Sequence, residues 1–111
     1  MFERGDLLLV PFPFSDLSAS KKRPVVAVTH PDAYGDFIAL AVTSRPQQEH
    51  GIPLAADDLV RGTLPLASWI RTDRVVTLNA SLVVKQVGTV SDIIIGVALG
   101  RLCDFVGDGG A

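Results

Sequence analysis

Residues 4–28 read RGDLLLVPFPFSDLSASKKRPVVAV, and this stretch decides the fold. Two apolar runs, residues 7–13 and 24–29, flank a polar loop over residues 15–22. Each run has the length and the leucine- or valine-rich composition of a β-strand, and the two prolines of the first run place its far end at a sheet edge or bulge. Because no crossover helix separates the runs, they predict consecutive strands of a meander rather than a βαβ unit.

The same pattern continues through most of the chain. Residues 36–43 (DFIALAVT), 52–55, 64–71 and 74–78 are further apolar runs between turns at 30–35 and 44–51, so we expect five or six strands. Residues 83–90 fit a strand less well, because the polar pair Lys85-Gln86 divides them. From Ser91 the apolar spacing becomes helical and predicts a C-terminal helix of about four turns. We expect its apolar face to carry Ile93, Ile94, Val97, Leu102 and Phe105. The predicted fold class is mainly β, a small closed or half-closed barrel with a C-terminal helix.

Composition limits the class of protein. With 111 residues, 48% of them hydrophobic, we expect one domain over residues 1–106, a flexible tail over 107–111, and an apolar subunit interface. The net charge of −2 means that any nucleic-acid site relies on local positive charge. One cysteine, Cys103, forms no internal disulfide, and we expect it to be a small buried side chain. No metal-ligand spacing, signal peptide or membrane span is found in the sequence, which favours a cytoplasmic protein without a structural metal.

Several motifs in order carry a resemblance to a known family. Arg4-Gly5-Asp6, Val10-Pro11-Phe12 and residues 22–28 (KRPVVAV) open the chain, and residues 41–44 (AVTS) and 70–72 (IRT) follow. Together they resemble the PemK/MazF toxins of type II toxin–antitoxin systems. The resemblance implies an SH3-like barrel, a two-fold homodimer and a cognate antitoxin that covers the RNA site. It also implies cofactor-free and metal-free cleavage of single-stranded messenger RNA, which leaves a 2′,3′-cyclic phosphate and a 5′-hydroxyl.

The resemblance also assigns roles to residues. Arg23, of the Arg-Pro motif, and Thr43, which closes the third strand, match the family's catalytic pair. A guanidinium suits the charge that develops on phosphoryl oxygens, and a hydroxyl can position the phosphate. Without the resemblance, Arg23 reads as a solvated arginine and Thr43 as a residue with high β propensity. The predicted RNA-binding residues are Lys21, Lys22, Ser44, Arg45, Trp69 and Arg71.

The general acid and base stay unassigned at this stage. Some relatives have an acidic residue three positions before the arginine at position 71, where this chain has Ser68, and others have a histidine in the first loop, which residues 15–22 lack. Arg23, Asp16 and Asp73 are the candidates. His30 and His50 lie in predicted turns, where a surface role is favoured over catalysis.

Other interpretations remain open from the sequence. Trp69 fits a core or dimer interface as well as a stacking platform. A gyrase poison of the same fold, similar to CcdB, and a relative that has lost its catalytic activity are the alternative functions.

Overall fold

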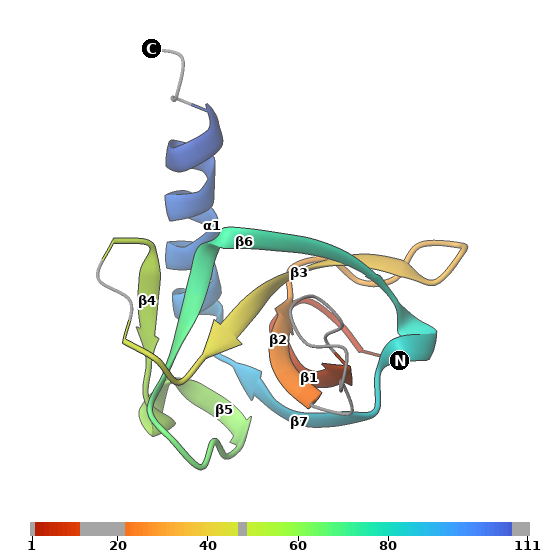
Figure 1. The fold of residues 1–111 in the computed structure, drawn as a ribbon, viewed down its shortest axis with the longest axis horizontal. Coiled ribbons are helices and arrows are strands. Elements are labelled where there is room, and N and C mark those ends of the chain that lie inside the picture. Colours follow the sequence, from red (N-terminus) through yellow and green to blue (C-terminus); the bar gives the residue numbers. More distant parts are fainter. Residues whose placement is uncertain (1, 12–21, 47–48, 108–111) are drawn as a thin grey trace.

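The computed structural model describes residues 2–11, 22–46 and 49–107. Seven antiparallel strands form one sheet in the order β4-β6-β3-β2-β1-β7-β5, and the sheet curls into a half-barrel beside one helix (Figure 1). The elements are β1 (Asp6–Pro11), β2 (Lys22–Ala27), β3 (Asp36–Thr43), β4 (Gly51–Leu54), η1 (Ala56–Asp58), β5 (Leu59–Gly62), β6 (Ser68–Asn79), η2 (Ala80–Leu82), β7 (Lys85–Val90) and α1 (Asp92–Gly107).

The predicted fold class, mainly β with a C-terminal helix, is confirmed. β3 has the predicted bounds, but the sheet has seven strands where five or six were expected, and β2 begins at Lys22, which was predicted as loop, and ends at Ala27 instead of residue 29. Two further differences concern β5 and β6. The short edge strand β5 was not predicted, because it follows two aspartates that favour a turn. Residues 64–71 and 74–78 were predicted as two strands, whereas β6 is continuous from Ser68. The polar Thr72 and Asp73 between them favour a break, but in the structure Thr72 bonds to the His50 carbonyl oxygen and Asp73 bonds to Arg71.

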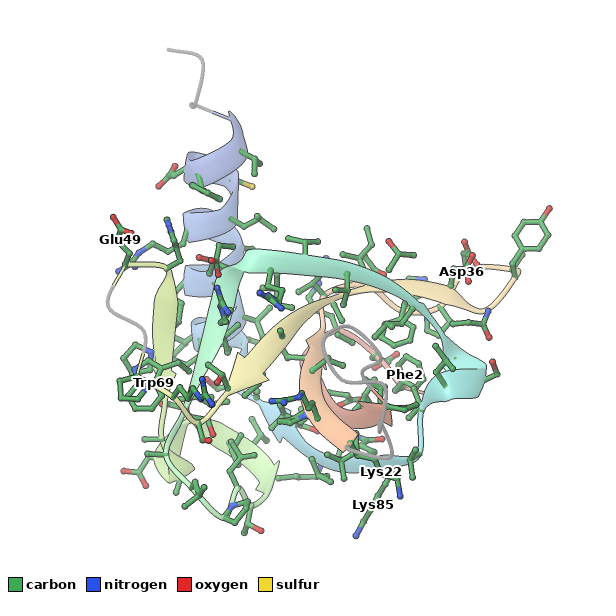
Figure 2. The ribbon with its side chains drawn as sticks, in the orientation of Figure 1. Phe2, Lys22, Asp36, Glu49, Trp69 and Lys85 are labelled. Carbon is green, nitrogen blue, oxygen red and sulfur yellow. The ribbon has the colours of Figure 1, made fainter. Side chains whose placement is uncertain are left out.

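Apolar side chains lie on both faces of the curled sheet, because successive strand residues point to opposite sides. The helix-side cluster is Leu7, Val26, Val28, Leu40, Val42, Ile52, Leu54, Ile70, Val90, Ile95 and Ala98. The far-side cluster is Leu8, Val10, Val25, Ala27, Phe37, Ala39, Ala41 and Leu78. The ring of Phe2 packs edge-on against Phe37, with 4.7 Å between the ring centroids, and extends the far-side cluster (Figure 2).

Helix α1 buries only part of the face that was predicted. Ile94 and Leu102 pack against the helix-side cluster as expected, but the buried residues are Ile95 and Ala98, whereas Ile93 is 79% exposed and Val97 is 43% exposed. The helix has apolar residues on nearly all sides, so the apolar spacing does not select the buried face. Cys103, predicted to be buried, is exposed on this helix. In the described chain, no helix is long and apolar enough to cross a membrane. Gly107 ends α1, and the remainder of the expected tail lies outside the described residues.

Candidate functional site

Strand pairing places the two predicted catalytic residues at the same end of neighbouring strands. β2 and β3 pair from Ala27 opposite Ala39 to Val25 opposite Ala41, and Arg23 and Thr43 each lie two residues beyond this last pair. On the other side of β2, Arg23 is paired with Val10. Residues two apart in a strand share a face, so Arg23 and Thr43 lie on the face of the far-side cluster, where its apolar side chains end. Arg23 is exposed and Thr43 is partly exposed.

Two more strands contribute residues to the same face. Thr43 is paired with Trp69 of β6, and Trp69 is paired with Pro53 of β4. Since paired strands are about 4.8 Å apart, Thr43 and Trp69 lie roughly one strand spacing from each other. We call Arg23, Thr43, Trp69 and Pro53 the row, which joins a cation, a hydroxyl and an apolar surface on one face. Figure 2 shows Trp69 beside β4.

The hydroxyl of Thr43 is oriented by the chain that follows it. The backbone N–H of Arg45 donates a hydrogen bond to Thr43 Oγ1 at 3.1 Å. A hydroxyl that accepts in this way still has its own proton to donate. Ser44 and Arg45 are both exposed in the bend after β3. The bend therefore brings two further predicted RNA-binding residues to the end of the row.

A second arginine lies next to the row on β6. Arg71 is two residues beyond Trp69, and the alternating burial of residues 68–71 places both side chains opposite the buried Ile70. Its guanidinium donates two hydrogen bonds to Asp73, from Nε to Oδ1 at 3.1 Å and from Nη2 to Oδ2 at 2.8 Å. Hydrogen bonding to Arg71 lowers the pKa of Asp73 below its ordinary value, despite partial desolvation, and Asp73 raises the pKa of Arg71.

The family follows from a comparison with family models. The model for PemK-like, MazF-like toxins of type II toxin–antitoxin systems matches residues 3–106. The chain belongs to this PemK/MazF family. Among curated proteins, no significant sequence match is found.

Solved structures of PemK/MazF toxins share the fold. A MazE–MazF complex from Deinococcus radiodurans has a TM-score of 0.73 at 20% identity, covering 96% of this chain and 95% of that one. A mycobacterial endoribonuclease in complex with its cognate antitoxin has a TM-score of 0.72 at 18% identity, covering 96% of both chains. The Mycobacterium tuberculosis toxin MazF-mt6 has a TM-score of 0.69 at 18% identity, covering 93% of this chain and 96% of that one.

Other predicted site residues of this PemK/MazF chain lie apart from the row or outside the described residues. Lys22 is the first residue of β2 and is exposed, but as the neighbour of Arg23 it points to the opposite face of the strand. Lys21 and Asp16 lie outside the described residues. His30 is exposed in the turn before β3. The ring of His50 lies 4.6 Å from that of Phe105 of α1, which favours a packing role.

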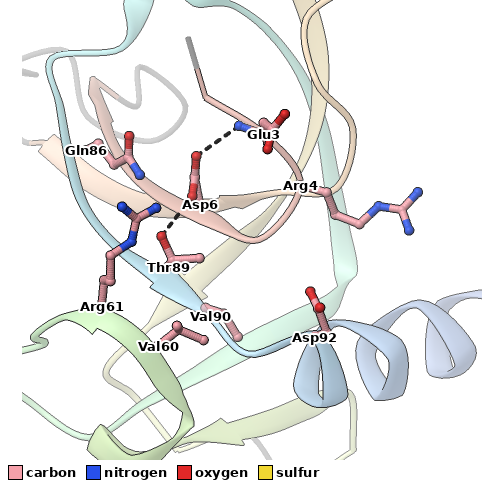
Figure 3. Close-up of a pocket in the computed structure, with 9 residues that line it drawn as sticks. All are labelled: Glu3, Arg4, Asp6, Val60, Arg61, Gln86, Thr89, Val90 and Asp92. Atoms are coloured by element: carbon pink, nitrogen blue, oxygen red, sulfur yellow. Dashed lines mark hydrogen bonds between the residues drawn. The ribbon is translucent and has the colours of Figure 1, made fainter.

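A pocket of about 520 Å³ lies between β1, β5, β7 and the start of α1, away from the row (Figure 3). Asp6 is buried there and accepts hydrogen bonds from the Glu3 backbone N–H and the Thr89 hydroxyl, both at 2.9 Å. The pocket also contains Arg61 and Asp92, so charges of both signs line it. None of the described site residues contributes to it.

Among the described residues, no cluster of His, Cys, Asp and Glu could hold a metal ion.

Sequence reasoning missed two features of the site. Pro53 adjoins Trp69 only through the pairing of β4 with β6, which no local pattern reveals. The pairing of Arg71 with Asp73 was also missed, although opposite charges two residues apart on a strand are a signal that could have found it.

Proposed function

We propose that this PemK/MazF toxin is a metal-independent endoribonuclease that cleaves single-stranded RNA, chiefly messenger RNA, on the face of the row. One observation supports this most strongly: Arg23 and Thr43 each lie two residues beyond the last β2–β3 pair, on the same accessible face. A guanidinium beside a hydroxyl that can still donate is suited to a phosphodiester. The similar mycobacterial protein described as an endoribonuclease agrees with the proposal.

The proposed reaction uses the 2′-hydroxyl of the RNA as the nucleophile. Its oxygen bonds to the adjacent phosphorus as the bond from phosphorus to the 5′-oxygen breaks, and a 2′,3′-cyclic phosphate and a 5′-hydroxyl form. One proton leaves the 2′-hydroxyl and one is delivered to the 5′-oxygen. Arg23 stabilises the charge that develops on the phosphoryl oxygens, and Thr43 donates a hydrogen bond that fixes the phosphate. Asp16, Asp73 and Arg23 itself are the acid and base candidates at this level.

RNA binding on either side of the scissile phosphate uses the remaining predicted residues. Trp69, with Pro53 beside it, offers an apolar surface on which an unstacked base can lie. Ser44, Arg45 and Arg71 supply donors near the row, and Lys21 and Lys22 add positive charge before Arg23. This local charge offsets the net charge of −2.

The proposal includes two protein partners. A cognate antitoxin is supported by the family and by the antitoxin-bound toxins of the same fold. A homodimer is supported by the apolar side chains that α1 leaves exposed, among them Ile93, Phe105 and Val106.

Cleavage assays with matched variants test the function. The purified toxin should cut single-stranded RNA in the presence of EDTA and leave cyclic-phosphate ends. Arg23→Ala removes a donor to the transition state and should lower kcat by about 100-fold or more. Thr43→Val removes one neutral hydrogen bond and should lower kcat by about tenfold.

Arg61→Ala is the control, because it removes the same charge from the exposed rim of the pocket outside the row. It should cleave like the wild type. Loss of cleavage in Arg61→Ala but not in Arg23→Ala would move the reaction to the pocket and overturn the proposal. RNA left intact by a toxin that inhibits gyrase would also overturn it.

A further inference from the structure

Strand β6 contains an arc opposite β3. Leu40 pairs with Val75 and Val42 pairs with Ile70, so a single residue of β3 faces residues 71–74 of β6. We call residues 71–74 the β6 arc. In Figure 1, β6 rises beside β4 and then bends sharply to run along β3. Before the arc β6 pairs with both β4 and β3, and after it β6 pairs with β3 alone.

The β6 arc is fixed from its buried side. Thr72 is 1% exposed, and its backbone N–H and its hydroxyl both donate to the His50 carbonyl oxygen, at 2.9 and 2.8 Å. These bonds continue the pairing of β4 with β6 by one residue beyond Gly51 and Arg71. The backbone that carries Arg71 and Asp73 is therefore held in place from beneath.

On the other side of the arc, the carboxylate of Asp73 accepts two hydrogen bonds from one edge of the Arg71 guanidinium. Both side chains are only about a quarter exposed, at 25% for Arg71 and 23% for Asp73. A guanidinium has five N–H donors, and the two bonds to Asp73 leave three for another acceptor. Because the two bonds are parallel, they fix the plane of the guanidinium as well as its position.

We propose that Asp73 is a positioning residue, which orients the Arg71 guanidinium towards a nucleotide bound beside Trp69. This inference rests on the proposed function for the ligand, a single-stranded RNA. Arg71 follows Trp69 by two residues on the same face, and Trp69 pairs with Thr43. A base that lies on Trp69 therefore presents its edge, or the adjoining phosphate, to the three remaining donors of Arg71.

The geometry weighs against the acid or base role that the sequence offered for Asp73. A general base must be directed at the substrate proton. Here each oxygen of Asp73 accepts one bond from Arg71, which turns the carboxylate towards the guanidinium, and the same bonds lower the pKa of the carboxyl and weaken it as a base. Asp73 therefore acts through Arg71 and does not take the proton of the 2′-hydroxyl.

A double-mutant cycle tests the proposal. Asp73→Asn should raise KM for RNA about three- to tenfold, the range for one displaced hydrogen-bonding group, with kcat within about twofold and an unchanged pH profile. Arg71→Ala should raise KM at least as much. If Asp73 works only through Arg71, the double variant should be no worse than Arg71→Ala alone. Asp104→Asn, at an exposed position of α1, controls for the lost charge.

Two results would overturn the positioning role. One is a fall in kcat of more than about tenfold in Asp73→Asn with loss of the acid limb of the pH profile, which is the behaviour of a base. The other is a penalty that adds fully to that of Arg71→Ala. If Asp73→Asn does not fold, Arg71→Lys replaces it, because lysine keeps the charge but lacks the two-pronged edge, and the same rise in KM is expected.

Binding of a mixed-sequence, 2′-O-methylated RNA separates this proposal from the proposed function. This RNA lacks the nucleophile, so its affinity reports on Arg71 and Asp73 even if the toxin cleaves nothing. If the three variants lose affinity in a coupled way but the wild type cleaves nothing, the proposed nuclease activity is wrong and the positioning role of Asp73 stands. If the wild type cleaves RNA but the losses of affinity are additive, the nuclease activity stands and the positioning role is wrong.

Discussion

Replacing Thr72 with valine tests how the β6 arc is held. Valine has nearly the shape of threonine and the same preference for strands, so the change removes the hydroxyl and little else. The lost bond is the 2.8 Å hydrogen bond to the His50 carbonyl oxygen. That oxygen keeps the backbone N–H of Thr72 at 2.9 Å, so no buried acceptor is left unpaired. We therefore expect a loss of about 1 kcal/mol in the free energy of unfolding, the net value of one hydrogen bond.

Urea unfolding at a fixed protein concentration measures this loss, since a dimer would make stability depend on concentration. The slope of the free energy against urea should not change, and the melting temperature should fall by about 4 °C. Thr77→Val, at an exposed position of the same strand, is the control and should change stability by less than about 0.5 kcal/mol. A loss above about 3 kcal/mol, or equal values for both variants, would refute the described anchoring of the arc.

Two further predictions concern stability. Gly62 has a φ of +81°, and a Cβ there would lie 2.1 Å from the backbone oxygen of Val87. Gly62→Ala should therefore lower the free energy of unfolding by more than about 2 kcal/mol, measured by thermal unfolding. Gly96→Ala is the control, because a Cβ there meets open space on α1, and it should be neutral or slightly stabilising. Equal melting temperatures would contradict the close pairing of β5 with β7. The pKa of Asp73 lies below its ordinary value of 3.8, so its ion pair stabilises the fold above that pH and is lost as the pH falls through the lowered pKa. The difference in free energy of unfolding between the wild type and Asp73→Asn, measured with urea, should therefore persist from pH 7 to about pH 4 and shrink only in stronger acid. A difference that disappears near pH 6 would contradict the ion pair of Asp73 with Arg71.

The sequence predicts the parts of this fold that depend on local pattern. β3 has an apolar run bounded by polar turns, and its predicted bounds agree with the structure. β6 was predicted in two pieces because Thr72 and Asp73 resemble a break in the strand. In the structure Thr72 is buried with its hydroxyl bonded to the carbonyl oxygen of His50, just before β4, and Asp73 bonds to Arg71. The local pattern does not contain the bond to His50, because that residue lies outside the strand.

The site depends on information of two kinds. The resemblance assigned Arg23 and Thr43, but their separation in the sequence does not reveal which strands pair or in which register. The structure adds that both residues lie two positions beyond the pair of Val25 with Ala41, on one face, and that Thr43 is paired with Trp69. The interaction of Arg71 with Asp73 was within reach of the sequence, since it spans two residues. What the sequence lacks is the evidence that the pair is shielded enough to fix a guanidinium.

Core and site in this toxin depend on the same strand alternation. Along β2, Val25 and Ala27 fill the far-side cluster, and Arg23 is the next residue on that face; along β3, Ala39 and Ala41 precede Thr43 in the same way. A one-residue slip of either strand would turn its core residues to the other face and its site residue away from the row. In β3, such a slip would put the buried Phe37 on the face where Ile38 is 40% exposed, and fully burying a large apolar side chain contributes about 1.5–3 kcal/mol, so burial favours the observed register. The apolar residues that stabilise the sheet therefore also determine the face on which Arg23 and Thr43 lie.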